Sequence, residues 1–186
     1  MPQNADAVST DSDDISGFQL EQAGALSLRD WVALTERDAD PFGHAAENLE
    51  WRAKERHVCL RDSDGVLVAA GGAAIVTVVV ADASFEVVGL GSLIVRRELR
   101  RHGVMTRVAD AIARVAEAMG PEHAMIFSQD HLLDVYRGRG YRAIEAPVSV
   151  DQPAGRIVMT QTAMWRPLRA GATWPEGPVE VHGLPF

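Results

Sequence analysis

Apolar residues recur every three or four positions in one long stretch of the chain. Charged residues fill the positions between them, and the apolar positions are Val104, Val108, Ile112, Val115 and Met119. This period predicts an amphipathic helix, which Gly120-Pro121 ends. Residues 28–34 show the same period on a smaller scale, with Ser27 in front as an N-cap. Further helices are expected over residues 43–52 and 132–137.

Apolar runs bounded by turn residues predict strands in the middle of the chain. Residues 58–60 and 66–74 flank an Asp-Ser-Asp-Gly turn at 62–65, and Asp-Gly between apolar runs is typical of a β-hairpin. Residues 75–80 and 85–95 predict a second hairpin around a turn at 81–84. Further strands are expected at 18–20, 123–128, 141–144 and 157–165, the last of them in an antiparallel pair.

These elements predict one folded domain over residues 17–170. Residues 1–16 are polar and acidic, which predicts a disordered leader. Residues 171–186 combine proline and glycine with large apolar side chains, so an irregular extension that packs on the domain through Trp174 and Phe186 is expected. With 47% hydrophobic residues among 186, the chain can bury one substantial core.

Composition and charge narrow the kinds of site and partner. Cys59 is the only cysteine, which excludes an intrachain disulfide and a cysteine-rich zinc site, and the histidines lack metal-ligand spacing, so no metal is expected. No apolar run reaches the roughly 18 residues of a membrane span, and no signal peptide is visible. A cytoplasmic protein without a membrane partner is expected. The net charge of −8 argues against nucleic-acid binding and suits a cationic amine substrate.

Residues 91–106 place a short charged loop between an apolar strand and the long helix. The strand ends at Val95, and the loop closes on Gly103 directly before the helix. Free backbone N–H groups at a helix N-terminus attract anions. A glycine there lets the chain approach a phosphate without a Cβ in the way. The pattern therefore predicts a pyrophosphate-binding loop.

Two motifs resemble the Gcn5-related N-acetyltransferase (GNAT) superfamily. The loop Arg100-Arg101-His102-Gly103-Val104-Met105 is similar to the family's Arg/Gln-x-x-Gly-x-Gly/Ala, with methionine where glycine or alanine is usual. The second motif is F-S-Q-D-H-L-L-D-V-Y-R-G-R-G-Y at residues 127–141, in which Tyr136, Gly140 and Tyr141 take the family's positions and Asp130 stands where asparagine is common. Both motifs occur in the family's order and separation. The resemblance covers residues 64–150 well.

The resemblance implies an α/β (α+β) fold. Its sheet would be mixed, mostly antiparallel, with six to seven strands, splayed where acetyl-CoA enters and flanked by about four helices. The resemblance also implies that Tyr136 is the general acid, since a phenol is protonated at neutral pH and can donate to the leaving thiolate. The residues that it implies for cofactor binding are Leu93, Ile94, Val95, Arg100, Arg101, His102, Gly103, Val104, Met105, Thr106 and Asp130.

The general base is not assigned by the motifs. Many family members place Glu or His on the strand before the phosphate loop, at positions that are Gly89 and Gly91 here. Glu86, Glu145 and the carboxylate of Phe186 are candidates, and a chain of ordered water is another.

The resemblance implies acetyl-CoA-dependent N-acetylation of a primary amine of a small molecule, by direct attack through a tetrahedral intermediate. The chain is loosely nearest the small-amine and aminoglycoside branches. By analogy, the acceptor pocket would include Phe42, His44, Glu47 and Trp51. Two alternatives stay open: a protein or peptide N-acetyltransferase, and a non-catalytic acyl-CoA-binding module. A homodimer is compatible with these features. The amine, the acyl chain and the oligomeric state are not determined by the sequence.

Overall fold

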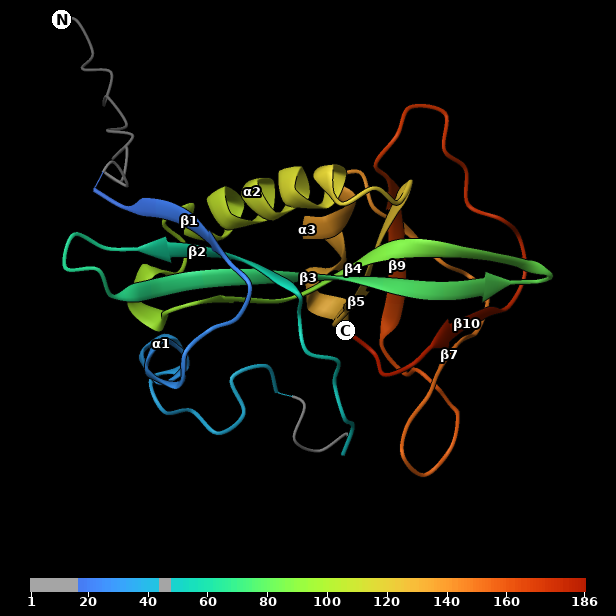
Figure 1. Cartoon of the computed structure of the whole chain (residues 1–186), viewed down its shortest axis with the longest axis horizontal. Coiled ribbons are helices and arrows are strands. Elements are labelled where there is room, and N and C mark those ends of the chain that lie inside the picture. Colours follow the sequence, from blue (N-terminus) through green and yellow to red (C-terminus); the bar gives the residue numbers. More distant parts are fainter. Residues whose placement is uncertain (1–16, 44–47) are drawn as a thin grey trace, which may run out of the picture.

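The computed structural model describes residues 17–43 and 48–186, which form one curled, mostly antiparallel sheet with helices packed against it (Figure 1). Its elements in chain order are β1 (Gln19–Ala23), α1 (Leu28–Thr35), β2 (Arg56–Arg61), β3 (Leu67–Val80), β4 (Ala83–Val95), α2 (Val104–Ala118), β5 (His123–Ser128), α3 (Leu133–Arg137), β6 (Arg142–Ala143), β7 (Val148–Val150), β8 (Ile157–Val158), β9 (Thr162–Pro167) and β10 (Val179–His182).

The sheet has the order β6-β9-β5-β4-β3-β10-β7-β8, with β2 and β1 added beside the first half of β3. The pairs β4–β5 and β7–β10 are parallel, and the other pairs are antiparallel. The α/β class and the mixed, mostly antiparallel sheet are therefore confirmed. Ten strands occur among the described residues, more than the six or seven expected, because four of them have only two to four residues.

The long strands β3 and β4 form the centre of the core. α2 covers one face of the sheet, and its buried residues Val104, Val108 and Ile112 are those that the apolar period predicts. A second cluster lies around β10, β7 and the outer half of β3. No described helix is long and apolar enough to cross a membrane.

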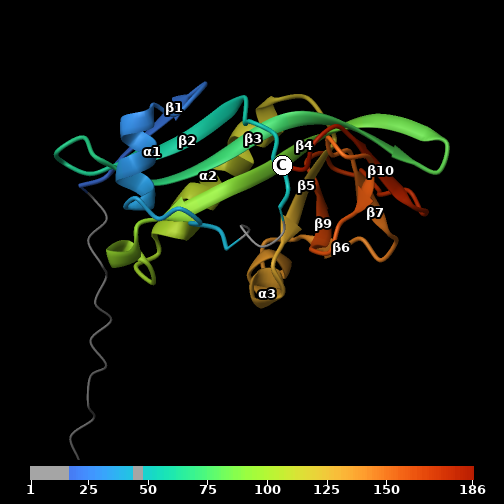
Figure 2. The same cartoon turned by 90° about the horizontal axis from the view of Figure 1, so that it is seen from below.

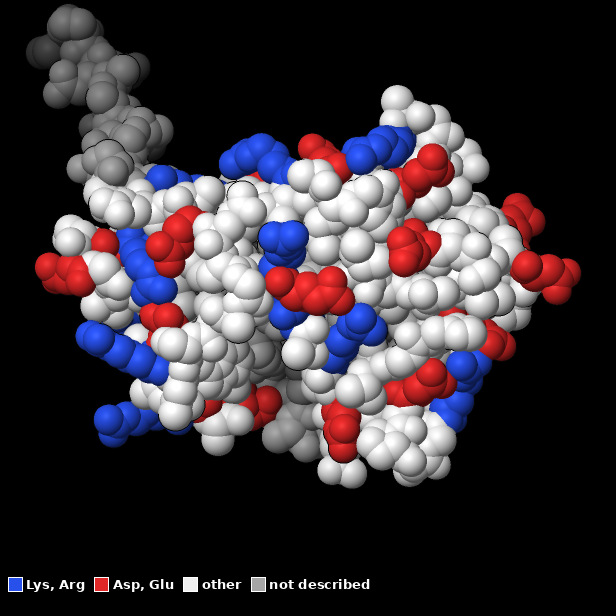
Figure 3. All heavy atoms as spheres, viewed as in Figure 1, with Lys and Arg blue, Asp and Glu red and all other residues white. Residues whose placement is uncertain are grey.

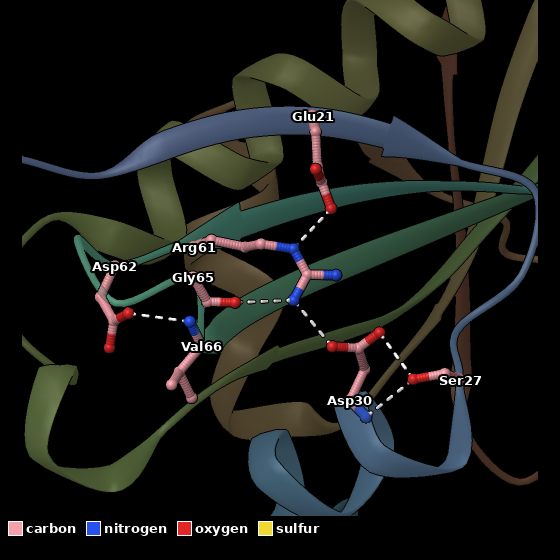
Figure 4. Close-up of polar contacts among 7 residues, drawn as sticks. All are labelled: Glu21, Ser27, Asp30, Arg61, Asp62, Gly65 and Val66. Atoms are coloured by element: carbon pink, nitrogen blue, oxygen red, sulfur yellow. Dashed lines mark hydrogen bonds and ion pairs between the residues drawn. The ribbon is translucent and has the colours of Figure 1, made fainter.

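Arg61 links β1 and α1 to the β2–β3 hairpin (Figure 4). Its guanidinium lies 2.6 Å from Glu21 on β1 and 2.7 Å from Asp30 on α1, and it also donates to the carbonyl of Gly65 in the turn. Ser27 caps α1 as predicted, by accepting from the N–H of Asp30. The Arg61 guanidinium is the main cause that holds the pKa of Asp30 below its ordinary value.

The helix predicted over residues 43–52 is wrong for the part of it that the structure describes. Residues 48–54 are irregular, and Asn48 has a left-handed φ of 48°. The backbone of this segment bonds to distant parts of the chain: Arg52 N–H to the carbonyl of Pro185 at 2.7 Å, and Glu50 N–H to the Gln152 side chain at 2.9 Å. These bonds replace the local ones of a helix.

Two strand predictions in the C-terminal third also need correction. Residues 157–165 form two strands, since β8 pairs with β7 while β9 pairs with β5 and β6. The extension expected to be irregular contains β10, which joins the sheet between β3 and β7. Its large side chains do pack on the domain: Trp174 stacks on Trp165 at 5.5 Å, and Phe186 is buried. The leader expected over residues 1–16 lies outside the described residues.

Candidate active site

β4 separates from β5 in the middle of the sheet, as the resemblance implies. The two strands pair only at Val88 and Gly89, opposite Ala124 and Met125. Beyond that point β5 leads to α3, while β4 continues toward the start of α2 (Figure 2). β4 also gains an extra residue opposite β3, and Ser92 there has a φ of 53°. Such a bulge bends a strand away from its neighbour, which explains where the sheet opens.

The loop after β4 ends in a helix N-terminus without a side-chain cap. Gly103 is the N-cap of α2 with a φ of 72°, and the first helical bond of the turn runs from Arg107 N–H to its carbonyl at 3.2 Å. The N–H groups of Val104, Met105 and Thr106 therefore precede the helical ladder and point out of the helix end. A Cβ on Gly103 would meet no protein atom within 4 Å. The space in front of this glycine is open.

The predicted loop residues divide into an exposed set and a buried set. Arg101, His102 and Thr106 are exposed around Gly103, where they can meet an anion. The Arg100 guanidinium turns back and donates to the carbonyl of Val95 at 3.1 Å. Val104 is buried and Met105 packs against the same core, so their contribution to a phosphate would be the backbone N–H.

The last three residues of β4 are Leu93, Ile94 and Val95, which follow the bulge at Ser92. Ile94 and Val95 are buried core residues, and Leu93 packs against the cluster under α2. Their side chains thus have structural roles, which leaves the backbone of the splayed strand for a ligand. Asp130 is exposed at the start of a single 3-10 turn, Asp130–Leu132, that leads into α3.

Tyr136 on α3 lines a cavity of about 50 Å³ between α2, β4 and α3. Leu90, Gly91 and Leu93 of β4 form the opposite wall. Burial raises the pKa of Tyr136 above its ordinary value, so the phenol keeps its proton at neutral pH. Its ring packs edge-on against Tyr141, which is a core residue.

The far side of β4 carries a feature that the motifs do not reveal. Lys54, the only lysine of the chain, lies across Gly72 and Gly91, which stand opposite each other in β3 and β4. Burial lowers the pKa of Lys54 to about 8. In the sequence, Lys54 stands before a strand, and the glycines occur as the pairs Gly71-Gly72 and Gly89/Gly91. Only the strand register brings the lysine and these glycines together.

Phe186 fills the place of the side chains that Gly89 and Gly91 lack. A Cβ on Gly89 would lie 2.5 Å from its ring, and one on Gly91 would lie 3.0 Å from its main-chain carbon. Of the candidate bases named from the sequence, Phe186 is the residue that packs against this part of β4. Glu86 lies five residues before Gly91 on an extended strand, roughly 17 Å away. Glu145 follows β6, which is separated from β4 by β9 and β5.

Of the residues named by analogy for the acceptor pocket, Phe42 and Trp51 are described. The Gln129 side chain donates to the carbonyl of Phe42 at 2.7 Å, which joins the segment after α1 to the end of β5. Trp51 packs against the cluster that contains Phe186. His44 and Glu47 lie outside the described residues.

A family model with the description Acetyltransferase (GNAT) family matches residues 25–141, which contain the splay, the loop at Gly103 and Tyr136. The chain belongs to the GNAT acetyltransferase family. It is an acyltransferase, and acyl-CoA-dependent N-acetyl transfer is the general reaction of this family. No curated protein sequence matches the chain.

Solved GNAT structures share the fold over most of the chain. YhbS from Escherichia coli, solved in complex with CoA, has 15% identity and a TM-score of 0.56 over 90% of this chain and 96% of its own. ElaA from Escherichia coli has 18% identity and a TM-score of 0.54 over 80% of this chain and 99% of its own. An N-acetylglutamate synthase from Neisseria gonorrhoeae, solved with coenzyme A and N-acetyl-glutamate, has 14% identity and a TM-score of 0.53 over 81% of this chain and 35% of its own.

Proposed function

We propose that this GNAT protein transfers the acetyl group of acetyl-CoA to a primary amine of a small molecule. The observation that carries the proposal is the opening between β4 and β5, which leads directly to the uncapped N-terminus of α2 at Gly103. A helix N-terminus with open space before it suits a pyrophosphate. The splayed backbone of Leu93 to Val95 offers hydrogen bonds to an extended arm.

Each part of the reaction has a candidate group in this arrangement. Acetyl-CoA supplies a thioester whose carbonyl carbon an amine can attack. Backbone N–H groups of β4 at the bulge would stabilise negative charge on the thioester oxygen. Tyr136 lines the adjoining cavity in its protonated form and would protonate the thiolate as it leaves. Asp130 and the loop from Arg100 to Thr106 would hold the rest of the cofactor.

The contacts on the far side of β4 favour a small acceptor over a protein. Residues 48–54 and the last residues of the chain meet over Gly89 and Gly91, joined by the bond from Arg52 to Pro185. This contact would form a wall of the acceptor site and restrict the space for a peptide. On the face seen in Figure 3, acidic and basic side chains are interspersed, which offers no continuous basic surface for an acidic partner.

The test combines cofactor binding with a search for the acceptor. Calorimetry with acetyl-CoA measures the affinity, and a panel of small primary amines, together with peptides, is then assayed for thiol release. Binding and acetylation of small amines but not of peptides would support the proposal. Acetylation of peptides alone would show that the acceptor is a peptide and not a small amine. Binding of acetyl-CoA without turnover on any amine would favour a non-catalytic acyl-CoA-binding module.

A further inference from the structure

Lys54 lies in a trough made by two glycines on neighbouring strands. Gly72 of β3 stands opposite Gly91 of β4. A Cβ on Gly72 would come within 2.4 Å of Lys54 Cγ, and a Cβ on Gly91 would come within 3.3 Å of Lys54 Cε. A side chain at Gly72 would therefore displace the lysine, and one at Gly91 would crowd it. The two glycines leave the space that this single side chain occupies.

The amino group of Lys54 has one hydrogen-bond partner among the described residues. It donates to the carbonyl of Arg52 at 3.4 Å, and no carboxylate among the described residues forms an ion pair with it. Burial, and to a smaller extent the Arg52 guanidinium, lower the pKa of Lys54 to about 8. The charged and titratable groups near it are Arg52, Glu55 (the ion-pair partner of Arg52) and His57, and the main chain of Phe186 lies beside Gly91.

We propose that Lys54 is the general base of the acetyl transfer and accepts the proton that the acceptor amine loses as it attacks. This inference rests on the proposed function. Gly91 lines the cavity of Tyr136, and a Cβ on the same glycine would point toward Lys54, so the two groups lie on opposite faces of β4 at the position where the strand leaves β5. β4 itself has glycine at positions 89 and 91. Lys54 reaches this place from the segment before β2.

The proton count of the proposed step balances. The amine nitrogen forms a bond to the thioester carbonyl carbon and gives one proton to the neutral Nζ of Lys54. The bond between the carbonyl carbon and sulfur then breaks, and Tyr136 gives its phenolic proton to the leaving thiolate. A proton passes through water from the Lys54 ammonium to the Tyr136 phenolate, which returns both groups to their starting forms.

Burial prepares the two groups for these opposite roles. It lowers the pKa of Lys54 to about 8 and raises the pKa of Tyr136 above its ordinary value of 10.0. In water both side chains would hold their protons at neutral pH. Between the two shifted values, Lys54 is neutral while Tyr136 is protonated, which is the combination that a base and an acid need.

The experiment compares the parent with four variants of the full chain. Lys54→Met removes the amine at similar volume, Lys54→Arg keeps the charge but does not titrate, and Gly72→Ala keeps the amine but displaces it. Arg29→Met is the control, because it removes a cation from the exposed surface of α1. For each protein, calorimetry gives the acetyl-CoA affinity, and the rate with the best amine of the panel is followed from pH 6 to 10.

The parent rate should rise with pH through a midpoint near the pKa of Lys54, about 8. Lys54→Met should lower the rate at pH 8 by about 10²-fold or more and remove this rise, with acetyl-CoA affinity within about twofold of the parent. Lys54→Arg should not restore the rate, Gly72→Ala should lower it by about tenfold, and Arg29→Met should leave it unchanged. A Lys54→Met protein that keeps both the rate and the rise would overturn the role.

A second measurement separates this inference from the proposed function. Because Lys54 is the only lysine, ¹³C,¹⁵N-lysine labelling gives one side-chain NMR signal, whose titration reports the pKa directly. A midpoint near 8 that shifts when the acceptor amine binds supports the base, and a midpoint near the ordinary value of 10.5 overturns it. A parent that binds no acetyl-CoA defeats the proposed function, whatever the lysine signal shows. A parent that binds acetyl-CoA but acetylates no amine overturns the base and keeps the cofactor site.

Discussion

The two sides of β4 are built in different ways. The side toward α2 comes from one continuous stretch, in which the strand, the loop at Gly103 and the helix follow one another. The proposed acceptor side is assembled from Lys54, Gly72, Gly91 and Phe186, which come from four separate parts of the chain. A site made of neighbouring residues keeps its geometry through local backbone structure. A site made of distant residues depends on the packing of the whole fold, so the two sides should respond differently to substitution.

The largest effect is expected where the acceptor side depends on distant packing. Phe186→Ala should lower the free energy of unfolding by about 3 kcal/mol, because its buried ring fills the space beside Gly89 and contacts Phe127. Urea unfolding measures this loss. Leu184→Ala, a half-buried neighbour, should cost less. Equal costs for the two variants would show that Phe186 is not a structural wall of the acceptor side.

Tyr136→Phe should lower turnover by about 10²-fold, because the ring still packs while the proton donor is lost. Acetyl-CoA affinity should stay nearly constant. Tyr141→Phe removes a hydroxyl from the adjacent core ring, 5.6 Å away between centroids, and is the matched control. If both variants keep turnover within about twofold of the parent, Tyr136 only packs and another group protonates the thiolate.

Gly103→Val tests the local side and should weaken acetyl-CoA binding about tenfold, or roughly 1.4 kcal/mol. Its Cβ would project into the open space where the phosphates are expected, and its φ of 72° also strains a β-branched residue. Gly171→Val is the control, because Gly171 has a φ of 83° and no neighbouring atom within 4 Å of its Cβ position. Calorimetry on the folded variants gives the affinities for acetyl-CoA. An affinity of Gly103→Val equal to that of the parent would contradict the phosphate-loop assignment.

A gain in stability is expected from Lys54→Met. The folded-state pKa of Lys54, about 8, is below its ordinary value of 10.5, so the protonated side chain is disfavoured in the fold. This penalty is fully present below pH 8 and disappears as the pH rises from 8 toward 10.5. Lys54→Met should therefore stabilise the protein more at pH 7 than at pH 10. Urea unfolding at both values checks this, and a gain that does not depend on pH would contradict the shifted pKa.

The sequence predicts well those elements whose bonds are local. The apolar period predicts α2, and the Asp-Gly turn predicts the β2–β3 hairpin, because the helical ladder and the tight turn lie within short segments. It fails for residues 48–52, whose backbone bonds to Gln152 and Pro185. It also fails for β10, a short run between prolines and glycines that β3 and β7 hold in the sheet.

The same division applies to the candidate site. Gly103 and Tyr136 stand in continuous motifs that a reader of the sequence can recognise. The trough of Lys54 exists only because the strand register sets Gly72 opposite Gly91. This register cannot be deduced from the spacing of residues along the chain. Phe186 is a candidate base from the sequence, but its position beside Gly89 is visible only in the fold. Motifs therefore predict the cofactor side, whereas the acceptor side requires the structure.

A crystal structure of the protein with CoA would show directly whether the cofactor enters where β4 leaves β5. We expect the arm of CoA to lie between β4 and β5, with the pyrophosphate within hydrogen-bond distance of the N–H groups of Val104, Met105 and Thr106. The thiol should lie near Tyr136 and Gly91. CoA bound elsewhere, for example in the groove lined by Leu20 and Arg114, would contradict this cofactor site.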